Sequence, residues 1–188
     1  RGELELRGYS AYLHPLGGGL LLGVGQDATT EGRTLGTLAS LFDVSDPAHP
    51  KRLDAFTLTK ARSDVEYDQH AFLWWPRAQL AVLPVQEYLD RPFLGAVGLR
   101  VQRAGITEVG RVVHPAEPGA ERVGSPGAPI SRALVVGDTL YTISSAGVKG
   151  SSLATFADRG FVRLSDDLGG PLPPPKLPPI PPTPPSTR

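Results

Sequence analysis

Short apolar stretches that alternate with polar residues, and that end at Gly or Pro, follow one another along this chain as far as residue 164. Strict alternation with β-branched and aromatic content is typical of half-buried strands. No window of a dozen residues carries a 3.6-residue apolar stripe free of Gly or Pro, so helices are not indicated. The pattern therefore predicts an all-β protein.

The predicted strands fall into an internal repeat with a register of 60 residues. Leu20 aligns with Leu80 and Leu140, and the segment Ala11-Tyr12-Leu13 aligns with Ala71-Phe72-Leu73. Repeats of about 40 to 60 residues built from short strands and tight turns are typical of propellers. We predict a β-propeller-like domain over residues 1–168, with three four-stranded antiparallel blades at residues 11–58, 71–113 and 131–164.

Two predictions concern the ends of this array. Residues 3–7 have Leu4 and Leu6 on one face and are expected to be the final strand of an earlier unit, and residues 152–156 are expected to be the third strand of the third blade. Propellers typically need about four to eight blades to close. We therefore expect an incomplete ring whose first and third repeats expose apolar faces, and which self-associates.

The composition changes after residue 168. Half of the 20 prolines lie in the tract PLPPPKLPPIPPTPPSTR at residues 171–188. Such a tract has few backbone donors, so residues 169–188 are expected to form a disordered, extended spacer. The tract also matches SH3-ligand patterns around Lys176. Such matches arise by chance in any proline tract that contains a lysine, so a bacterial wall spacer or a plain linker is the favoured interpretation.

Charge and cysteine content limit the classes of function. The chain carries 19 basic and 19 acidic residues, so no net field favours nucleic acid or an anionic membrane. The absence of cysteine excludes disulfides, thiolate zinc sites and cysteine nucleophiles. No apolar run approaches the roughly 18 to 20 residues that span a bilayer. Residue 1 is Arg with a strand-like stretch behind it, so we expect that the beginning of the protein is missing.

Several segments together resemble a known family. GYSAYLHPLGGGLLLGVGQD, SLFDVSDPAHPKRLD, YDQHAFLWWP, GAVGLRV and RALVVGDTLYTIS are similar to the C-terminal part of secreted bacterial and archaeal proteins that carry a β-propeller distantly related to WD repeats. The resemblance covers roughly residues 5 to 165. It implies a secreted or cell-surface propeller of more than three blades, of which this chain is a fragment, and a histidine where Gln69 stands.

The run Asp64-Val65-Glu66-Tyr67-Asp68-Gln69-His70 is the sharpest candidate for chemistry. If it is extended, its three carboxylates and its imidazole lie on one side and suit calcium or another divalent cation. Four such ligands would spread over about 20 Å, so at most two could reach one ion. We expect a solvated loop, and Asp68 and His70 as the ligands of any cation.

Other candidates have simpler structural explanations. Residues 23–28 match the dinucleotide fingerprint G-x-G-x-x-A, but a loop follows where a helix is needed, so close strand packing explains the glycines and no cofactor is expected. Trp74 and Trp75 point to opposite faces of a strand. One ring is expected to pack between blades, and the other to be partly exposed and available to a ligand. No serine lies in a nucleophile elbow.

These observations favour an exported, non-enzymatic propeller that binds a protein or an extracellular polymer through loops on one rim. The alternative is a hydrolase or metal-dependent enzyme at the central mouth, with Asp68 and His70 as acid, base or metal ligands. A third reading is a purely architectural spacer. A polar mouth with a strongly shifted pKa would favour the enzyme, and apolar exposure on a rim would favour binding.

Overall fold

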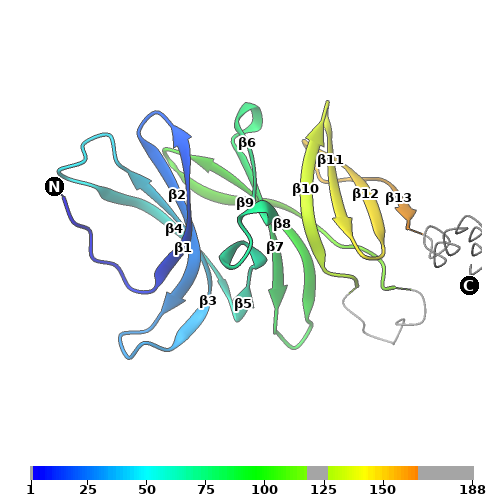
Figure 1. Ribbon diagram of the computed structural model, residues 1–188, viewed down its shortest axis with the longest axis horizontal. Helices are drawn as coiled ribbons and strands as arrows, with labels where there is room; N and C mark the ends of the chain where they lie inside the picture. The colour runs from blue at the N-terminus through cyan, green and yellow to red at the C-terminus, as the bar shows by residue number, and fades with distance from the viewer. Residues whose placement is uncertain (1, 118–126, 165–188) are drawn as a thin grey trace, which may run out of the picture.

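The computed structural model describes residues 2–117 and 127–164, which form three antiparallel sheets and no α-helix. Figure 1 shows the sheets side by side along the long axis of the molecule, in chain order. Each predicted blade corresponds to one sheet, so the all-β prediction with three antiparallel blades is confirmed. The predicted spacer at residues 169–188 lies outside the described residues.

The first and third sheets are simple meanders of four strands, as the alternation of apolar residues predicts. The strands of the first sheet are β1 (Tyr9–Gly17), β2 (Leu20–Ala28), β3 (Thr34–Asp43) and β4 (Lys51–Thr59). Those of the third sheet are β10 (Ile130–Val136), β11 (Thr139–Ser144), β12 (Gly147–Ser152) and β13 (Asp158–Arg163). The aligned leucines Leu20 and Leu140 both stand at the start of the second strand of their sheet, which explains the repeat register.

The second sheet is more elaborate than predicted, because its innermost position is shared by two short strands. Its strands are β5 (Ala61–Arg62), β6 (Leu73–Trp75), β7 (Leu80–Glu87), β8 (Phe93–Gln102) and β9 (Gly105–Val112). Both β5 and β6 pair with β7, at its opposite ends. Three 3₁₀ turns accompany them, namely η1 (Asp64–Glu66), η2 (Gln69–Ala71) and η3 (Pro76–Ala78).

Residues 64–70 form a loop with two capped 3₁₀ turns, so the condition of an extended run is not met and their carboxylates do not share one side of a strand. One local prediction is wrong. The third strand of the third blade is β12, and residues 153–157 form the turn that follows it, in which Ser152 accepts the backbone N–H of Phe156 at 2.8 Å. Residues 3–7 pair with none of the described strands, and their assignment as the final strand of an earlier unit stays a prediction, because the partners of such a strand would belong to that unit.

The faces of the second sheet are both buried, and each belongs to a separate core. Between the first and second sheets lie Leu22 and Leu41 from one side and Leu83 and Leu99 from the other. Leu80, Val82, Leu140 and Ile130 are the largest of the fully buried side chains between the second and third sheets. Strand β7 contributes alternate residues to both cores, which is the reason that almost all of its residues are buried.

A close contact joins the second sheet to the third. Gly98 of β8 and Gly110 of β9 are register partners, and the ring of Phe156 covers both of them. A Cβ atom at Gly98 would lie 2.1 Å from Phe156 Cζ, and one at Gly110 would lie 2.4 Å from Phe156 Cγ. Phe156 itself has φ of 60°, a conformation that costs energy in a bulky residue. The packing of its ring against two side-chain-free positions therefore holds the third sheet in place.

The outer face of the first sheet is only partly buried, so the expectation of an exposed apolar face is confirmed in part. Leu13 of β1, which alternates with core-packed Tyr12, is 50% exposed on this face. Leu38 is 5% exposed and Phe42 is 7% exposed, and both point away from the neighbouring core. The N-terminal segment lies beside this sheet (Figure 1) and is attached at one end by a 3.1 Å hydrogen bond from Gly2 N to Pro47 O. At its other end Gly8 lies against the backbone of Gln26. The approach is so close that a Cβ atom at Gly8 would lie 2.1 Å from the Gln26 carbonyl oxygen.

The outer face of the third sheet is exposed, as expected. Leu134 and Val136 of β10 alternate with residues of the core, so they lie on this face, together with Val162 of β13. Val162 is 69% exposed and Val136 is 62% exposed. Self-association through this face stays a prediction.

Replacing Gly98 with Ala should destabilise the protein, because the added methyl displaces the Phe156 ring. Overpacking of this kind costs about 1–3 kcal/mol, measurable as a lower midpoint in urea unfolding. Gly150→Ala is the matched control, since the nearest atom to its Cβ would be Thr139 Cγ2 at an ordinary contact distance of 3.5 Å, also in a strand. Equal midpoints for the two variants would mean that the aromatic ring is not the contact that matters.

Stability should also fall in acid because of His114, which is 2% exposed and hydrogen-bonds Ser144 Oγ at 2.7 Å and Thr142 Oγ1 at 2.8 Å. Burial, with Lys149 adding to it, lowers the pKa of His114 from 6.5 to about 4. The unfolded chain takes up this proton near pH 6.5, so the contribution is complete above pH 6.5 and is lost progressively toward pH 4. The loss is about 3 kcal/mol at pH 4.

The measurement is the free energy of unfolding of the native chain and of His114→Gln between pH 7.5 and 4. Since glutamine does not titrate, the variant should be less stable at pH 7.5 and should lose less stability on acidification. Parallel pH profiles would show that His114 contributes nothing to the acid sensitivity.

Candidate functional site

The innermost strand of the second sheet is interrupted, and the interruption forms the candidate site. Residues 63–72, here called the insertion, leave the sheet after β5 and return to it at β6. Figure 1 shows this segment as a coil at the centre of the molecule, in front of β7. Because it replaces part of an inner strand, it lies between the innermost strands of the two outer sheets.

Local hydrogen bonds explain why this sequence turns twice. Ser63 and Glu66 form a capping box around η1, in which each side chain accepts the backbone N–H of the other end. Ser63 Oγ also donates to Pro84 O of β7 at 2.7 Å, which attaches the turn to the sheet. Asp68 caps η2 by accepting the backbone N–H of His70 at 2.9 Å. Val65 is buried below the first turn, so the insertion has an apolar anchor.

One side of the insertion is attached to the first sheet. Glu66 accepts hydrogen bonds from Tyr9 Oη at 3.2 Å and from Gln26 Nε2. The ring of Phe72 lies 5.2 Å from that of Tyr12 and 4.9 Å from that of His14, measured between centroids. Burial, followed by the Glu66 carboxylate, raises the pKa of Tyr9, so this phenol stays protonated and donates.

The other side is attached to the third sheet by an ion pair. Arg132 of β10 reaches Asp68 Oδ2 at 2.7 Å, and Asp68 Oδ1 contacts His70 Nδ1 at 3.2 Å. The hydrogen bond from the His70 backbone, burial notwithstanding, lowers the pKa of Asp68, with the His70 ring and Arg132 acting in the same direction. Burial, and secondarily the charge of Asp68, raises the pKa of Asp64. The two aspartates are thus driven apart in acidity.

A hollow of about 350 Å³ opens between β1 and the insertion. It is lined by Ala11 and Tyr12 of β1 and by residues 65–70 of the insertion. Tyr67 is the most exposed large side chain around it, at 82%. The lining contains no serine, threonine or lysine, and its two carboxylates, Glu66 and Asp68, are engaged by neighbours. The arrangement offers rings and hydrogen-bonding groups to a ligand, and no activated nucleophile.

The predicted cation ligands Asp68 and His70 do come together at this hollow. Among residues 2–117 and 127–164 no group of three or more His, Asp or Glu side chains is placed to hold a metal ion. Asp64 and Glu66 do not join them, because the capped turns replace the extended run on which that geometry depended. The cation site therefore stays a prediction based on two ligands.

Trp74 and Trp75 lie away from the hollow, on β6. Their side chains point to opposite faces of the second sheet, as predicted, and Trp74 packs on the core shared with the first sheet while Trp75 packs on the core shared with the third. Both are partly buried, so the expectation of one ring in the core and one more open is wrong. Their role as ligand-binding residues stays a prediction.

Sequence reasoning missed Tyr67, Tyr9 and Arg132 as members of this site. The signal that could have located the insertion is the Ser63-x-x-Glu66 pattern, which indicates the start of a helical turn. No local signal pairs Arg132 with Asp68, since they meet only through the packing of two sheets. The glycines of the dinucleotide-like motif behave as expected, because a Cβ at Gly25 of β2 would lie 2.0 Å from Tyr9 O.

Comparison with known proteins agrees with this architecture. The profile of the family described as "Beta propeller domain" matches residues 1–156. The chain belongs to this β-propeller family. No helix in the described part of the chain is long and apolar enough to cross a membrane.

Two archaeal proteins are similar to parts of the propeller chain. An uncharacterized protein of Methanocaldococcus jannaschii is 39% identical over 87 residues, which are 46% of this chain and 13% of that protein. An uncharacterized protein of Archaeoglobus fulgidus is 40% identical over 72 residues, which are 38% of this chain and 11% of that protein. The aligned region is thus a small part of both relatives.

Among solved structures, the crystal structure of an exo-β-1,3-galactanase from Clostridium thermocellum is similar to the propeller chain with a TM-score of 0.40 and 12% identity. The similarity covers 79% of this chain and 35% of the galactanase.

We predict that Asp68 and His70 supply the ligands if a divalent cation binds to the propeller. Any heat released on titration with calcium, zinc or manganese should then be lost in the double variant Asp68→Ala/His70→Ala. The matched control is Asp46→Ala/His49→Ala, because these residues form another exposed Asp–His pair, with Nδ1 and Oδ2 2.8 Å apart. Binding heat that persists in the first variant would remove the cation site.

Proposed function

We propose that this propeller is a non-enzymatic binding module of an exported or cell-surface protein, and that the hollow beside the insertion holds an extracellular polymer or a partner protein. The observation that carries the proposal is the position of Tyr67, which is 82% exposed on a segment attached to both neighbouring sheets. Because the backbone that carries this ring is anchored on both sides, little backbone freedom is lost when a ligand covers the ring.

The chemistry around Tyr67 favours a polysaccharide among such ligands. An exposed phenol ring can stack on a sugar ring, while Gln69 and His70, which line the same hollow, can hydrogen-bond hydroxyl groups. The carboxylates Glu66 and Asp68 are bound by Tyr9 and Arg132, so they fix the position of the insertion beside the hollow. A protein partner would use the same tyrosine as a contact residue, since tyrosine is enriched at interfaces.

A hydrolase is the second candidate, supported by one observation. The pKa of Asp64 is raised, by burial and by Asp68, and that of Asp68 is lowered. Two carboxyl groups whose acidities are driven apart are the arrangement that general acid and base catalysis requires. In such an enzyme the proton donor would be Asp64, which precedes the residues of the insertion that line the hollow and is not itself among them.

The binding proposal is tested by affinity electrophoresis in gels that contain soluble neutral polysaccharides such as laminarin, galactan or xylan. We expect at least one polymer to retard the full chain, and Tyr67→Ala to weaken that retardation about tenfold or more, since loss of a contact aromatic typically costs about 1–3 kcal/mol. The matched control is Tyr88→Ala, because Tyr88 is also exposed and lies outside the hollow.

Equal retardation of the Tyr67 and Tyr88 variants would overturn the assignment of the hollow. Absence of retardation by every polymer, together with cross-linking of a host protein to a photoreactive residue at position 67, would give the site to a protein. Reducing ends released from a retarding polymer by the native chain, and lost in Asp64→Asn, would replace the binding module with the hydrolase.

A further inference from the structure

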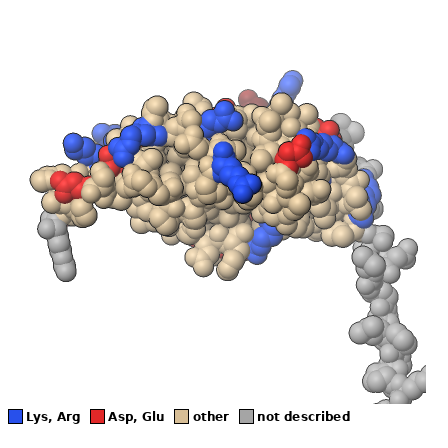
Figure 2. Space-filling view, turned by 90° about the horizontal axis from the view of Figure 1, so that it is seen from above, with Lys and Arg blue, Asp and Glu red and all other residues tan. Residues whose placement is uncertain are grey.

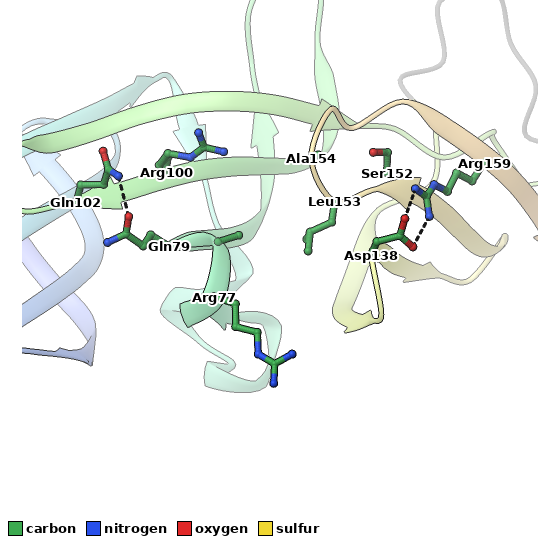
Figure 3. Close-up of a pocket in the computed structure, with 10 residues that line it drawn as sticks. Arg77, Gln79, Arg100, Gln102, Asp138, Ser152, Leu153, Ala154 and Arg159 are labelled. Carbon is green, nitrogen blue, oxygen red and sulfur yellow. Dashed lines mark hydrogen bonds and ion pairs between the residues drawn. The ribbon is translucent and has the colours of Figure 1, made fainter.

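A second cavity, separate from the insertion, lies between the second and third sheets. Its volume is about 480 Å³, a size typical of sites for small molecules. One wall comes from η3 and the end of β8, and the other comes from the β10–β11 turn and the segment that follows β12. Figure 3 shows Arg77, Gln79, Arg100 and Gln102 on the first wall and Asp138 and Arg159 on the second. We call this cavity the intersheet cleft.

The first wall is held by main-chain and side-chain hydrogen bonds around Gln79. This residue ends η3 with φ of 50°, and its carbonyl accepts the backbone N–H of Val101 at 2.8 Å. Its Oε1 accepts Gln102 Nε2 at 2.7 Å (Figure 3). Within the described residues, Gln79 Nε2 and Gln102 Oε1 have no further partner, so the pair presents one donor and one acceptor to the cleft.

The charges of the cleft are unequal. Arg159 binds Asp138 in a bidentate manner, with both N–O distances 2.7 Å. Arg77 and Arg100 form no hydrogen bond or ion pair with any residue in the described ranges, although they line the same cavity. Three arginines and one carboxylate therefore line the cleft, in a chain whose total charge is balanced. Figure 2 shows that basic side chains are spread along the face seen from above, with acidic side chains beside them toward both ends of the molecule.

An apolar surface completes the cleft. Leu153 points into the space between the two walls (Figure 3) and packs at its base on the core between the second and third sheets. Ala154 and Ala78 also line the cavity. Nearby, the Phe156 ring over Gly98 and Gly110 holds the two walls at a constant separation. The cleft is thus built on packed sheets rather than on loops alone.

We infer that the intersheet cleft binds a hydroxylated carboxylate, such as a sugar acid, through Arg77 and Arg100. Guanidinium groups form paired hydrogen bonds with carboxylate oxygens, and the Asp138–Arg159 pair shows that this geometry is already realised in the cleft. The amides of Gln79 and Gln102 match hydroxyl groups, and Leu153 matches the apolar face of a sugar ring. The site is distinct from the hollow at the insertion.

The test is calorimetric titration of the full chain with digalacturonate at low salt, with cellobiose as a neutral disaccharide of similar size and with inorganic phosphate. We expect binding of digalacturonate, no binding of cellobiose, and an affinity for phosphate at least tenfold weaker. Arg77→Gln/Arg100→Gln should reduce the affinity for digalacturonate at least tenfold. The matched control Arg33→Gln/Arg91→Gln removes the same charge at exposed arginines outside the cleft and should leave it unchanged.

A gain-of-binding variant keeps the test independent of losses in stability. Asp138→Asn releases Arg159 from its carboxylate and should increase the affinity for digalacturonate several-fold. The inference is overturned if digalacturonate does not bind, if the Arg77/Arg100 and Arg33/Arg91 variants bind equally, or if Asp138→Asn weakens binding. Phosphate binding as tight as that of digalacturonate would also overturn it, in favour of a phosphate site.

Discussion

Face-to-face packing of neighbouring sheets is the constraint on which the rest of this structure depends, and the contact of Phe156 with Gly98 and Gly110 shows it most clearly. An antiparallel sheet with an apolar face must bury that face, and in a propeller only another sheet can do so. Two glycines opposite each other in β8 and β9 open a depression without side chains, and the ring from the third sheet fills it. Both the core beneath the ring and the intersheet cleft beside it follow from this contact.

The middle sheet has a special position because it is covered on both faces. Strand β7 supplies Leu83 and Val85 to one core and Leu80 and Val82 to the other. Its inner edge does not carry a continuous strand, and the insertion takes the free place there. Because the insertion binds Gln26 of the first sheet and Arg132 of the third, it connects the two outer sheets across the inner edge of the middle one.

The two candidate sites differ in whether their charged side chains are paired. In the hollow beside the insertion, each carboxylate of the lining is hydrogen-bonded or paired, and exposed Tyr67 offers a neutral contact. In the intersheet cleft, one ion pair is complete and two guanidinium groups face the solvent. The chain as a whole has equal numbers of basic and acidic residues, but the lining of the intersheet cleft has an excess of positive charge.

Sequence alone determined the class of fold, the number of sheets and most strands, because alternation along a strand and turns at Gly or Pro are local properties. The 60-residue register was visible since Leu20, Leu80 and Leu140 each stand at the beginning of the corresponding strand, β2, β7 or β11. Alternation also placed Trp74 and Trp75 on opposite faces. In the insertion the same rule failed, since capping by Ser63 and Asp68 competes with an extended backbone, and the attachment to β7 favours the turns.

Only the tertiary structure decided which side chains share a site. Arg132 meets Asp68 across 64 positions of sequence, and Arg77 and Asp138 line one cleft that exists only where two sheets meet. It also decided that part of the outer face of the first sheet is covered, because the N-terminal segment lies beside this sheet and contacts it at Gly2 and Gly8. Such contacts depend on the approach of surfaces distant in sequence, and no local pattern of residues encodes that approach.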